Sequence, residues 1–407
     1  VFTYGANAIG RIVTKTVQDA SETRSVQSSE QYDHAGRLVS KTDTSGLSTT
    51  YAYAYAYVTK RTVTATMPGG ATEVDTYYSD GTLEKITGNG VVHQYFDYGV
   101  NATGSTRWSR IYTGPDLGSS AMWTEMTYDT LNRVSKIERA GYNGSTVTTT
   151  YTYDTSGDDR LLAVAATGQA DTLFGYDDLG NVVRHGLDIG DNGSLDPSST
   201  DRITDEDTTY YKDGSNNWWR KTVKEVYATD NNGAATTTSQ ELTMLTGLGT
   251  NEIEKTKVID IHDNETVTTV TLDHAGKKVT RTVVYPDSAA AVTVTRNGLL
   301  QSDTSKTGLT TTYAYDAIGR PMVVTDPRGN DTTSVYHLSG IGAEGKVKSV
   351  IDESGNRTCY SYSSSTGWLT RTTTGADASC SGNDQRFEYY TDGRLKRTWG
   401  DVPYPVC

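Results

Sequence analysis

Acidic and histidine side chains are the residues of this chain that could carry out acid–base chemistry. The sequence has 50 Asp and Glu residues and six His. A His beside a carboxylate could act as a general base, and two facing carboxylates could hydrolyse a glycoside. However, His34 and His274 stand in matching DHAG settings, which indicates turn positions. The other His residues have no partner at metal-ligand or triad spacing. There is no GxSxG, HExxH or P-loop motif, and no GxGxxG in a strand-to-helix setting. We therefore expect no catalysis.

The densest acidic stretch, DIGDNGSLD, partly resembles an EF-hand calcium loop. Short oxygen-bearing side chains surround a potential sharp turn at Gly193, as suits Ca²⁺. The acids expected at loop positions three and twelve are replaced by Gly190 and Ser199. The alternative is a solvated acidic loop. The candidate ligands of a structural calcium ion are Asp188, Asp191, Asn192, Asp196 and Asp201.

Two groups of aromatic residues could stack on sugars or on another protein. Trp218 and Trp219 are adjacent, so in a strand their rings face opposite ways, and one can be buried while the other is exposed. The run YAYAYAY places its phenols on one strand face and its alanines on the other. The alternatives are a core role for the Trp pair and a Tyr ladder within the sheet. The four phenols of the run belong to Tyr51, Tyr53, Tyr55 and Tyr57.

Two of the three cysteines could form a disulfide. Cys359 and Cys380 flank a segment that can form a two-stranded excursion whose ends meet. A Cys359–Cys380 bridge is expected in a secreted protein, whereas free thiols would pack as small hydrophobic groups. Cys407 would remain unpaired within this segment.

These residues must be positioned by a repeat, which recurs along nearly the whole chain. Tyr-Asp, a short loop with Gly or Asn, and usually a basic residue appear as YDHAGRL, YDTLNRV, YDDLGNVV and YDAIGRP. Each copy reads as strand, tight turn and strand, because Asp can accept turn N–H groups and Gly tolerates a positive φ. The predicted structural turn residues are Tyr32, Asp33, Gly36, Tyr128, Asp129, Tyr176, Asp177, Gly180, Tyr315, Asp316 and Gly319.

The repeated Tyr-Asp turn resembles that of the Rhs/YD-repeat family. The resemblance implies a long β-hairpin ribbon that spirals into a hollow shell. Related shells enclose toxin domains in bacterial Rhs effectors and in the cocoon component of Tc toxins, and form part of the teneurin ectodomain. The family's aspartyl self-cleaving core carries a DPxGL-type signature, to which Asp326-Pro327-Arg328-Gly329-Asn330 is only superficially similar. This stretch lacks the closing Leu, so we expect it to be a return turn.

Composition supports a repeat architecture rather than a compact core. Only 35% of the 407 residues are hydrophobic, and 28 Tyr accompany 4 Phe. Backbone ladders and cross-strand Thr and Tyr pairs can hold such a sheet. We expect one continuous repeat segment over 1–407, part of a longer protein. Within it we predict a Gly- and Ser-rich loop over 101–120, an acidic loop insertion over 186–209, and cysteine-bearing C-terminal repeats over 359–407.

The sequence therefore predicts an all-β fold, a YD-repeat hairpin ribbon forming an open or partial shell with little helix. The net charge of −13 argues against nucleic-acid partners and anionic lipid, and no apolar run is long enough to span a membrane. We expect an extracellular or cell-surface structural protein of bacterial origin that encloses cargo or forms filaments. Its partners would be other copies or segments joined through sheet edges, an enclosed cargo domain, or glycans. The alternative function is a carbohydrate-binding adhesin.

Overall fold

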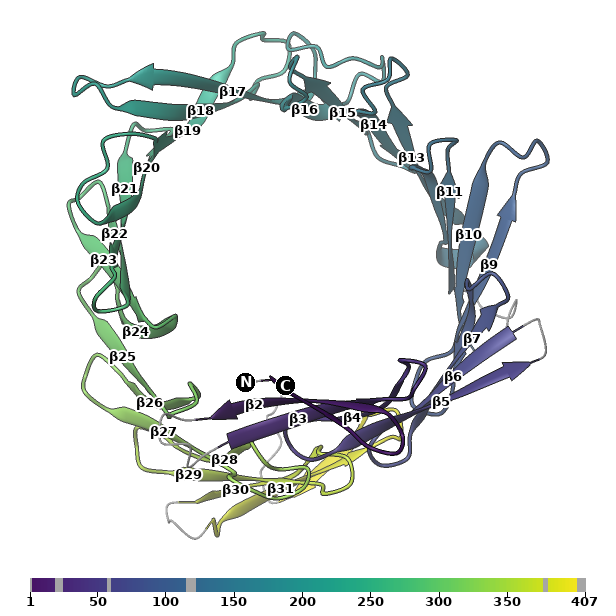
Figure 1. Ribbon diagram of the computed structural model, residues 1–407. Coiled ribbons are helices and arrows are strands. Elements are labelled where there is room, and N and C mark those ends of the chain that lie inside the picture. The colour runs from purple at the N-terminus through teal and green to yellow at the C-terminus, as the bar shows by residue number, and fades with distance from the viewer. Residues whose placement is uncertain (1, 19–24, 57–59, 115–121, 376–379, 401–407) are drawn as a thin grey trace. The chain divides into compact units, whose positions relative to one another are not determined.

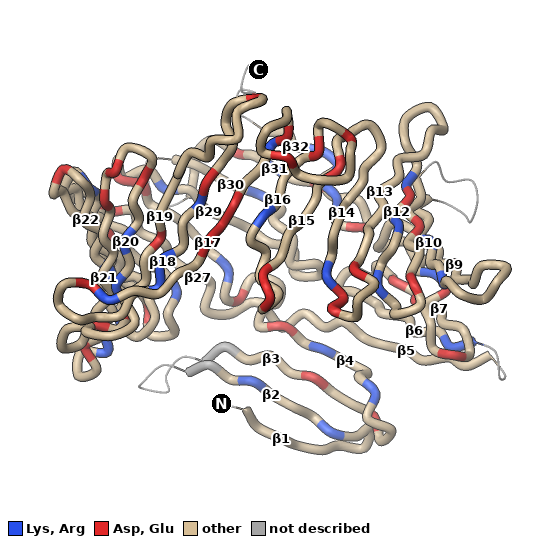
Figure 2. Tube along the Cα trace, turned by 90° about the horizontal axis from the view of Figure 1, so that it is seen from above, with Lys and Arg blue, Asp and Glu red and all other residues tan. Residues whose placement is uncertain are grey.

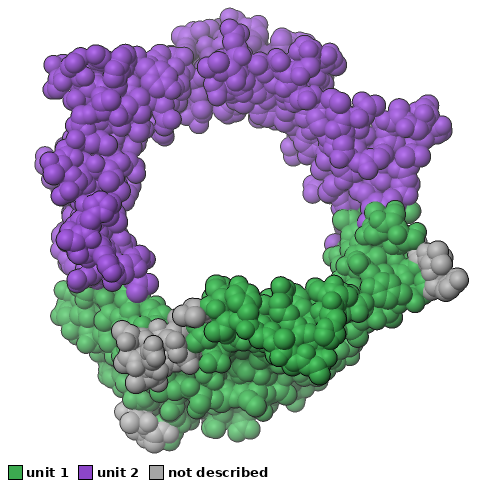
Figure 3. Space-filling view, in the orientation of Figure 1, with its two compact units in different colours: residues 1–97, 111–120, 311–407 green, residues 98–110, 121–310 purple. Residues whose placement is uncertain are grey.

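The computed structural model describes residues 2–18, 25–56, 60–114, 122–375 and 380–400 (Figure 1). The chain divides into two compact units (Figure 3). Unit 1 comprises Val1–Asp97, Ile111–Ser120 and Thr311–Cys407, so it unites the N-terminal and C-terminal parts of the sequence. Unit 2 comprises Tyr98–Arg110 and Ala121–Thr310.

Unit 1 contains the first eight and the last eight strands. The N-terminal strands are β1 (Phe2–Ala6), β2 (Arg11–Gln18), β3 (Ser25–Tyr32), β4 (Leu38–Thr42), β5 (Ser48–Ala56), β6 (Lys60–Thr66), β7 (Thr72–Tyr78) and β8 (Leu83–Thr87). The C-terminal strands are β25 (Thr310–Tyr315), β26 (Pro321–Thr325), β27 (Asp331–Tyr336), β28 (Val347–Ile351), β29 (Arg357–Tyr362), β30 (Leu369–Gly375), β31 (Asn383–Tyr389) and β32 (Leu395–Gly400).

Unit 2 contains the middle strands and the only helical turn of the described residues, η1 (Tyr142–Gly144). Parts of β9 (Gln94–Val100) and β10 (Arg107–Thr113) belong to each unit. The strands wholly within unit 2 are β11 (Met122–Tyr128), β12 (Val134–Ala140), β13 (Thr146–Tyr153), β14 (Leu161–Ala166), β15 (Asp171–Tyr176), β16 (Val182–Asp188), β17 (Arg202–Lys212), β18 (Trp218–Val226), β19 (Thr236–Met244), β20 (Glu252–Asp260), β21 (Glu265–Asp273), β22 (Lys278–Val284), β23 (Ala290–Arg296) and β24 (Leu299–Thr304).

Within each unit, consecutive strands pair antiparallel and form a ribbon of hairpins. In unit 1, β1 to β8 pair in sequence order, and so do β25 to β32. The turns therefore alternate between two rims of the ribbon. We call the rim with the turns after odd-numbered strands the YD rim, because every YDHAG-type turn lies there. The opposite rim, with the turns after even-numbered strands, is the return rim.

An Asp-capped turn recurs on both rims, and on the YD rim a β-bulge usually lies beside it. Asp33 Oδ1 accepts the N–H groups of Ala35 and Arg37, both at 2.9 Å. Gly36 follows with a φ of +79°, and the register shifts between Gln31 and Tyr32. This is a type of hairpin loop in which a left-handed residue closes a bulge. The same double capping occurs at Asp43, Asp129, Asp177, Asp213, Asp260, Asp316, Asp326 and Asp352.

The predicted fold class is confirmed: the described residues form an all-β hairpin ribbon with little helix. Few side chains are buried, and the largest apolar cluster is Trp219, Leu242 and Met244. Lys and Arg as well as Asp and Glu are scattered over the strands of each unit (Figure 2). Backbone ladders and cross-strand pairs therefore supply most of the cohesion, as the lean hydrophobic composition indicated.

Two predicted loops are shorter in the structure. The acidic insertion predicted over 186–209 is limited to 189–201, because β16 continues to Asp188 and β17 begins at Arg202. The acids after Arg202 face cations on neighbouring strands: Asp205 accepts two hydrogen bonds of 2.7 Å from Arg184. These cross-strand pairs favour a strand. Likewise, β10 occupies 107–113 of the predicted loop over 101–120.

Candidate functional site

The repeat side chains link neighbouring turns of the ribbon. Arg133 Nε donates to Asp129 Oδ2 at 2.7 Å, so the turn carboxylate holds the guanidinium in place. The same guanidinium lies 4.3 Å from the ring centroid of Tyr153, the Tyr that opens the next YD-rim turn. The Tyr153 hydroxyl donates to the carbonyl of Val134 at 2.9 Å. Each repeat therefore fixes the following one through a carboxylate, a cation and an aromatic ring.

This arrangement recurs in both units. The hydroxyl-to-carbonyl bond joins Tyr53 to Leu38, Tyr176 to Leu161, Tyr336 to Pro321 and Tyr362 to Val347. The matching cations over those four rings are Arg37 (4.9 Å), Arg160 (5.6 Å), Arg320 (4.3 Å) and Lys346 (5.1 Å). The sequence analysis treated each Tyr as part of its own turn and missed its contact with the preceding repeat. The signal that could have revealed the link is the basic residue at the end of each turn, considered together with the Tyr of the next repeat.

The tyrosine run of β5 takes part in the same link. Tyr53 is half-buried under Arg37, whereas Tyr55 is 62% exposed and its hydroxyl accepts a 3.0 Å bond from Arg37. Tyr51 is also half-buried, and the alternating alanines are exposed. Tyr57 lies outside the described residues. The phenol face is thus mostly engaged in the ribbon, and binding of a sugar or protein by this run stays a prediction.

The two adjacent tryptophans of β18 face opposite ways. Trp219 is 3% exposed and packs against Leu242 and Met244. Trp218 is 42% exposed, beside the ammonium of Lys212 at 5.3 Å from its ring centroid. Trp219 is therefore a core residue, and Trp218 alone of the pair can contact a ligand.

The acidic loop uses its carboxylates to hold its own backbone. Asp201 Oδ1 accepts the N–H groups of Ile189 and Gly190, and its Oδ2 accepts that of Asp196. Asp188 accepts N–H groups from Asn192 and Gly193. Asp188 and Asp201 are buried.

This arrangement fits a calcium ion poorly. Asn192 Oδ1 accepts from Ser194, and Asp196 Oδ1 accepts from Ser198. Asp191 has a left-handed backbone. Across the part of the chain that the structure describes, no three His, Cys, Asp or Glu side chains cluster as a metal site would need. Calcium binding at this loop therefore stays a prediction from the sequence.

The structure joins Cys359 of β29 to Cys380 by a disulfide, with the two Cα atoms 5.7 Å apart. Cys359 lies in β29 and Cys380 between β30 and β31, so the segment that the bridge closes contains all of β30. Cys407 lies outside the described residues.

Within unit 1, turns from distant parts of the sequence meet along what we call the seam. Two return-rim turns of the N-terminal strands meet two YD-rim turns of the C-terminal strands. Turn 43–47 contacts turns 337–346 and 363–368, and turn 67–71 contacts turn 363–368. The N–H of Gly342 donates to the carbonyl of Ser45 at 2.8 Å. Ser45, Leu47 and Ala71 are buried. The seam is thus a packed rim-to-rim contact.

Two glycines and a lysine complete the seam. Gly69 has a φ of +90°, and a Cβ on it would lie 2.4 Å from Thr366 Cγ2, so a side chain there would need both a strained backbone and a shift of Thr366. The ammonium of Lys346 donates to the carbonyl of Gly367. Burial lowers the pKa of Lys346, and the carboxylate of Asp43 opposes that shift.

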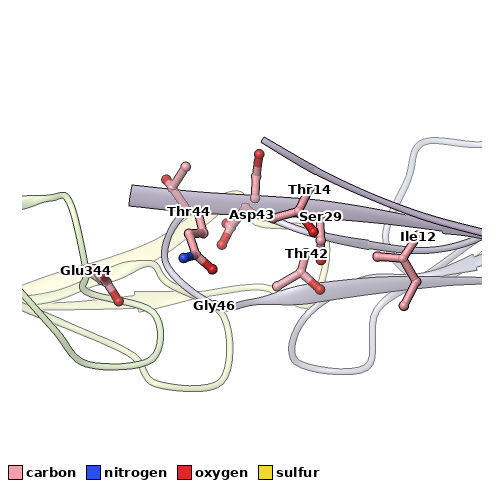
Figure 4. Close-up of a pocket in the computed structure, with 10 residues that line it drawn as sticks. Ile12, Thr14, Ser29, Thr42, Asp43, Thr44, Gly46 and Glu344 are labelled. Carbon is pink, nitrogen blue, oxygen red and sulfur yellow. The ribbon is translucent and has the colours of Figure 1, made fainter. Parts of the chain in front are cut away.

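A polar groove of about 510 Å³ lies beside the seam (Figure 4). Hydroxyl-bearing side chains of the N-terminal strands form much of its wall, and Glu344 reaches it from the C-terminal part of unit 1. Of its two acids, Asp43 is occupied in capping its own turn. The residues around the groove are Ile12, Thr14, Gln27, Ser28, Ser29, Thr42, Asp43, Thr44, Gly46 and Glu344.

The RHS repeat family model matches residues 32–72 and 295–331, which include the turns at Tyr32 and Tyr315. The chain contains RHS repeats. The resemblance to the Rhs/YD-repeat family, inferred from the Tyr-Asp turns, is thereby confirmed. No curated protein matches the chain.

Solved structures of Tc toxin proteins share the fold of this chain. The crystal structure of TcdB2-TccC3-TEV matches with a TM-score of 0.50 and 12% identity, over 96% of this chain and 23% of that chain. TcdB2-TccC3 matches with a TM-score of 0.50 and 13% identity, over the same shares of the two chains. The Photorhabdus luminescens Tc holotoxin pore gives 0.49 and 11%, over 97% and 23%. The chain thus spans less than a quarter of these structures, and at such identities the likeness concerns the fold.

Proposed function

We propose that this chain is a structural segment of a bacterial extracellular RHS-repeat shell and carries no catalysis itself. The observation that supports this most is the use made of the repeat side chains. The Asp, the cation and the Tyr of each complete repeat are occupied by turn capping and by the link to the next repeat. Side chains engaged in this way build a wall and leave no group free to react.

The electrostatics of the repeat carboxylates also support a structural role. Backbone N–H donation from Arg37 lowers the pKa of Asp33, and the side chain of Asn181 lowers that of Asp177. A general acid needs the opposite shift. Burial raises the pKa of two carboxyls in β7, Glu73 and Asp75. They are the residues to replace if hydrolytic activity were ever detected.

The proposed partners follow from the family and the fold. The terminal strands β1 and β32 offer sheet edges to other copies or segments of the same protein, and a shell could enclose a cargo domain. A disulfide-bearing chain suits an extracellular or cell-surface location. Among the described residues, no helix has the length and apolar character needed to cross a membrane.

Solution scattering tests the shell proposal directly. A hollow shell has more long interatomic distances in its pair-distance distribution than a solid globule of equal mass. Its radius of gyration is also larger. We expect this profile for the purified chain, and negative-stain images with a dark centre. A radius of gyration equal to that of a compact globule would contradict the shell. Screening for glycoside hydrolysis, with E73Q/D75N as the matched variant, tests the absence of catalysis.

A second candidate function is carbohydrate binding, and the observation that favours it is an exposed aromatic pair. Tyr210 and Lys212 point to one face of β17, and Trp218 is paired with Lys212, so both aromatic rings share that face. Tyr210 is 60% exposed. Binding on a glycan array that is lost in Trp218→Ala and kept in Tyr51→Phe would support it. A blank array for the wild type would contradict it.

A further inference from the structure

The seam shows how one rim of this ribbon receives the other. The docking turn, Asp43-Thr44-Ser45-Gly46-Leu47, is a return-rim turn that offers its Ser45 carbonyl to Gly342 of a YD-rim turn. Ser45 becomes 3% exposed in that contact. A return-rim turn of these repeats can therefore pack closely against a YD-rim turn.

A second return-rim turn of the same form is fully exposed, and the same residue order also occurs in a YD-rim turn at 154–157. Residues 352–356 read Asp-Glu-Ser-Gly-Asn, which repeats the Asp-x-Ser-Gly order of 43–47. The geometry is also repeated: Asp352 caps the turn, and Gly355 has a φ of +84° against +78° at Gly46. All five residues of 352–356 are exposed. The turn has the form of the seam's docking element and lies on the return rim of the C-terminal strands, free of the seam.

A matching seat is open on the YD rim of the N-terminal strands. Turns 7–10 and 33–37 border a hollow of about 390 Å³ that Asn7, Gly10, Arg11 and His34 help to line. Ile9 above it is 52% exposed. The seat carries Arg11, and the Asp33 that also lines it is ion-paired with Arg37. The exposed turn carries Asp352 and Glu353, so the net charges of the two surfaces are complementary. The seam has the same polarity, with Asp43 on its return rim and Lys346 on its YD rim.

We propose that turn 352–356 of one copy docks into the 7–10 and 33–37 seat of a second copy, so that copies associate head to tail. The contact uses different surfaces on the two copies, and it leaves one free rim at each end of every assembly. This inference goes beyond the proposed scaffold role because it names the surfaces through which copies associate. These surfaces are the turns at the rims, in place of the edge strands β1 and β32.

Two single-rim variants test the arrangement. Ala35→Glu places an acid in the seat opposite Glu353, and Ser354→Trp adds a bulky ring to the docking turn without a charge that the seat variant could attract. Ala35 and Ser354 have exposed side chains, so both variants should fold. By sedimentation or light scattering, wild type should exceed its monomer mass of 44.2 kDa increasingly with concentration. Each variant alone should stay at the monomer mass, with self-association weakened at least tenfold.

The decisive sample is the equimolar mixture. Each variant keeps one intact rim, so the mixture should form a one-to-one dimer and stop there. Ala54→Arg, on the exposed alanine face of β5, is the matched control and should associate like wild type. Far-UV circular dichroism and thermal melting check that every variant is folded.

Three results would overturn the proposal: a wild type that is monomeric at every concentration, variants that associate like wild type, or a mixture that stays monomeric. A monomer with a hollow scattering profile would overturn head-to-tail docking and leave the shell proposal standing.

Discussion

The indole N–H of Trp219 donates to Asp213 Oδ2 at 2.9 Å, which ties the buried cluster of Trp219, Leu242 and Met244 to the cap of a YD-rim turn. Donation from Trp219 is the main cause that lowers the pKa of Asp213 from 3.8 to about 2. The N–H of Asn217 adds to the shift, and burial opposes it. Turn capping and core packing are therefore coupled at this point.

This coupling predicts acid sensitivity at Asp213. Because the pKa of the carboxyl is lower in the folded state, the unfolded state binds the proton more readily between pH 3.8 and about 2. The stabilisation is present above pH 3.8 and is lost as the pH falls through this window. Urea unfolding followed by Trp fluorescence should show a smaller loss of stability from pH 4 to 2 in Asp213→Asn than in wild type. Equal losses would show that the carboxylate does not stabilise the cluster.

The link between repeats predicts an energetic coupling between Arg133 and Tyr153. Tyr153→Phe removes only the hydroxyl bond to the Val134 carbonyl and should cost about 1 kcal/mol of unfolding free energy. A double-mutant cycle of Arg133→Ala and Tyr153→Ala should give a coupling of roughly 0.5–1 kcal/mol, as for a partly exposed cation–π pair. Tyr142→Ala, at a ring that is 88% exposed, is the control for loss of an aromatic side chain. Additive effects at Arg133 and Tyr153 would refute the link.

Local features were predictable from the sequence, and contacts between distant residues were not. The Asp33 turn follows from five consecutive residues, because capping and a positive φ act within the turn itself. The opposite orientation of Trp218 and Trp219 follows from strand alternation. The length of the acidic loop was overestimated, since the partner of Asp205 is Arg184 on another strand. The seam contact between Ser45 and Gly342 has no local sign, because it depends on how the ribbon packs within unit 1.

The acidic loop predicts that Asp201 stabilises the fold without calcium. Its buried carboxylate accepts three backbone N–H groups, and Asp201→Ala would leave them without a protein partner. The expected cost is about 1–3 kcal/mol. Millimolar Ca²⁺ or a chelator should leave the thermal midpoint of wild type unchanged. A midpoint that rises with Ca²⁺ in wild type and not in Asp201→Ala would instead support the calcium hypothesis.

The seam predicts that Gly342 tolerates no side chain, for two separable reasons. Its φ is +81°, a conformation that costs other residues roughly 1–2 kcal/mol. In addition, a Cβ there would lie 2.2 Å from the Ser363 carbonyl oxygen, a backbone atom that cannot turn aside. Gly81, in another YD-rim turn, has a similar φ of +89° and nothing within 4 Å of a Cβ. Gly342→Ala should therefore lose on the order of 1–3 kcal/mol more unfolding free energy than Gly81→Ala. Denaturant titration of both variants measures the difference, and equal losses would mean that the close packing of Gly342 against Ser363 does not constrain this turn.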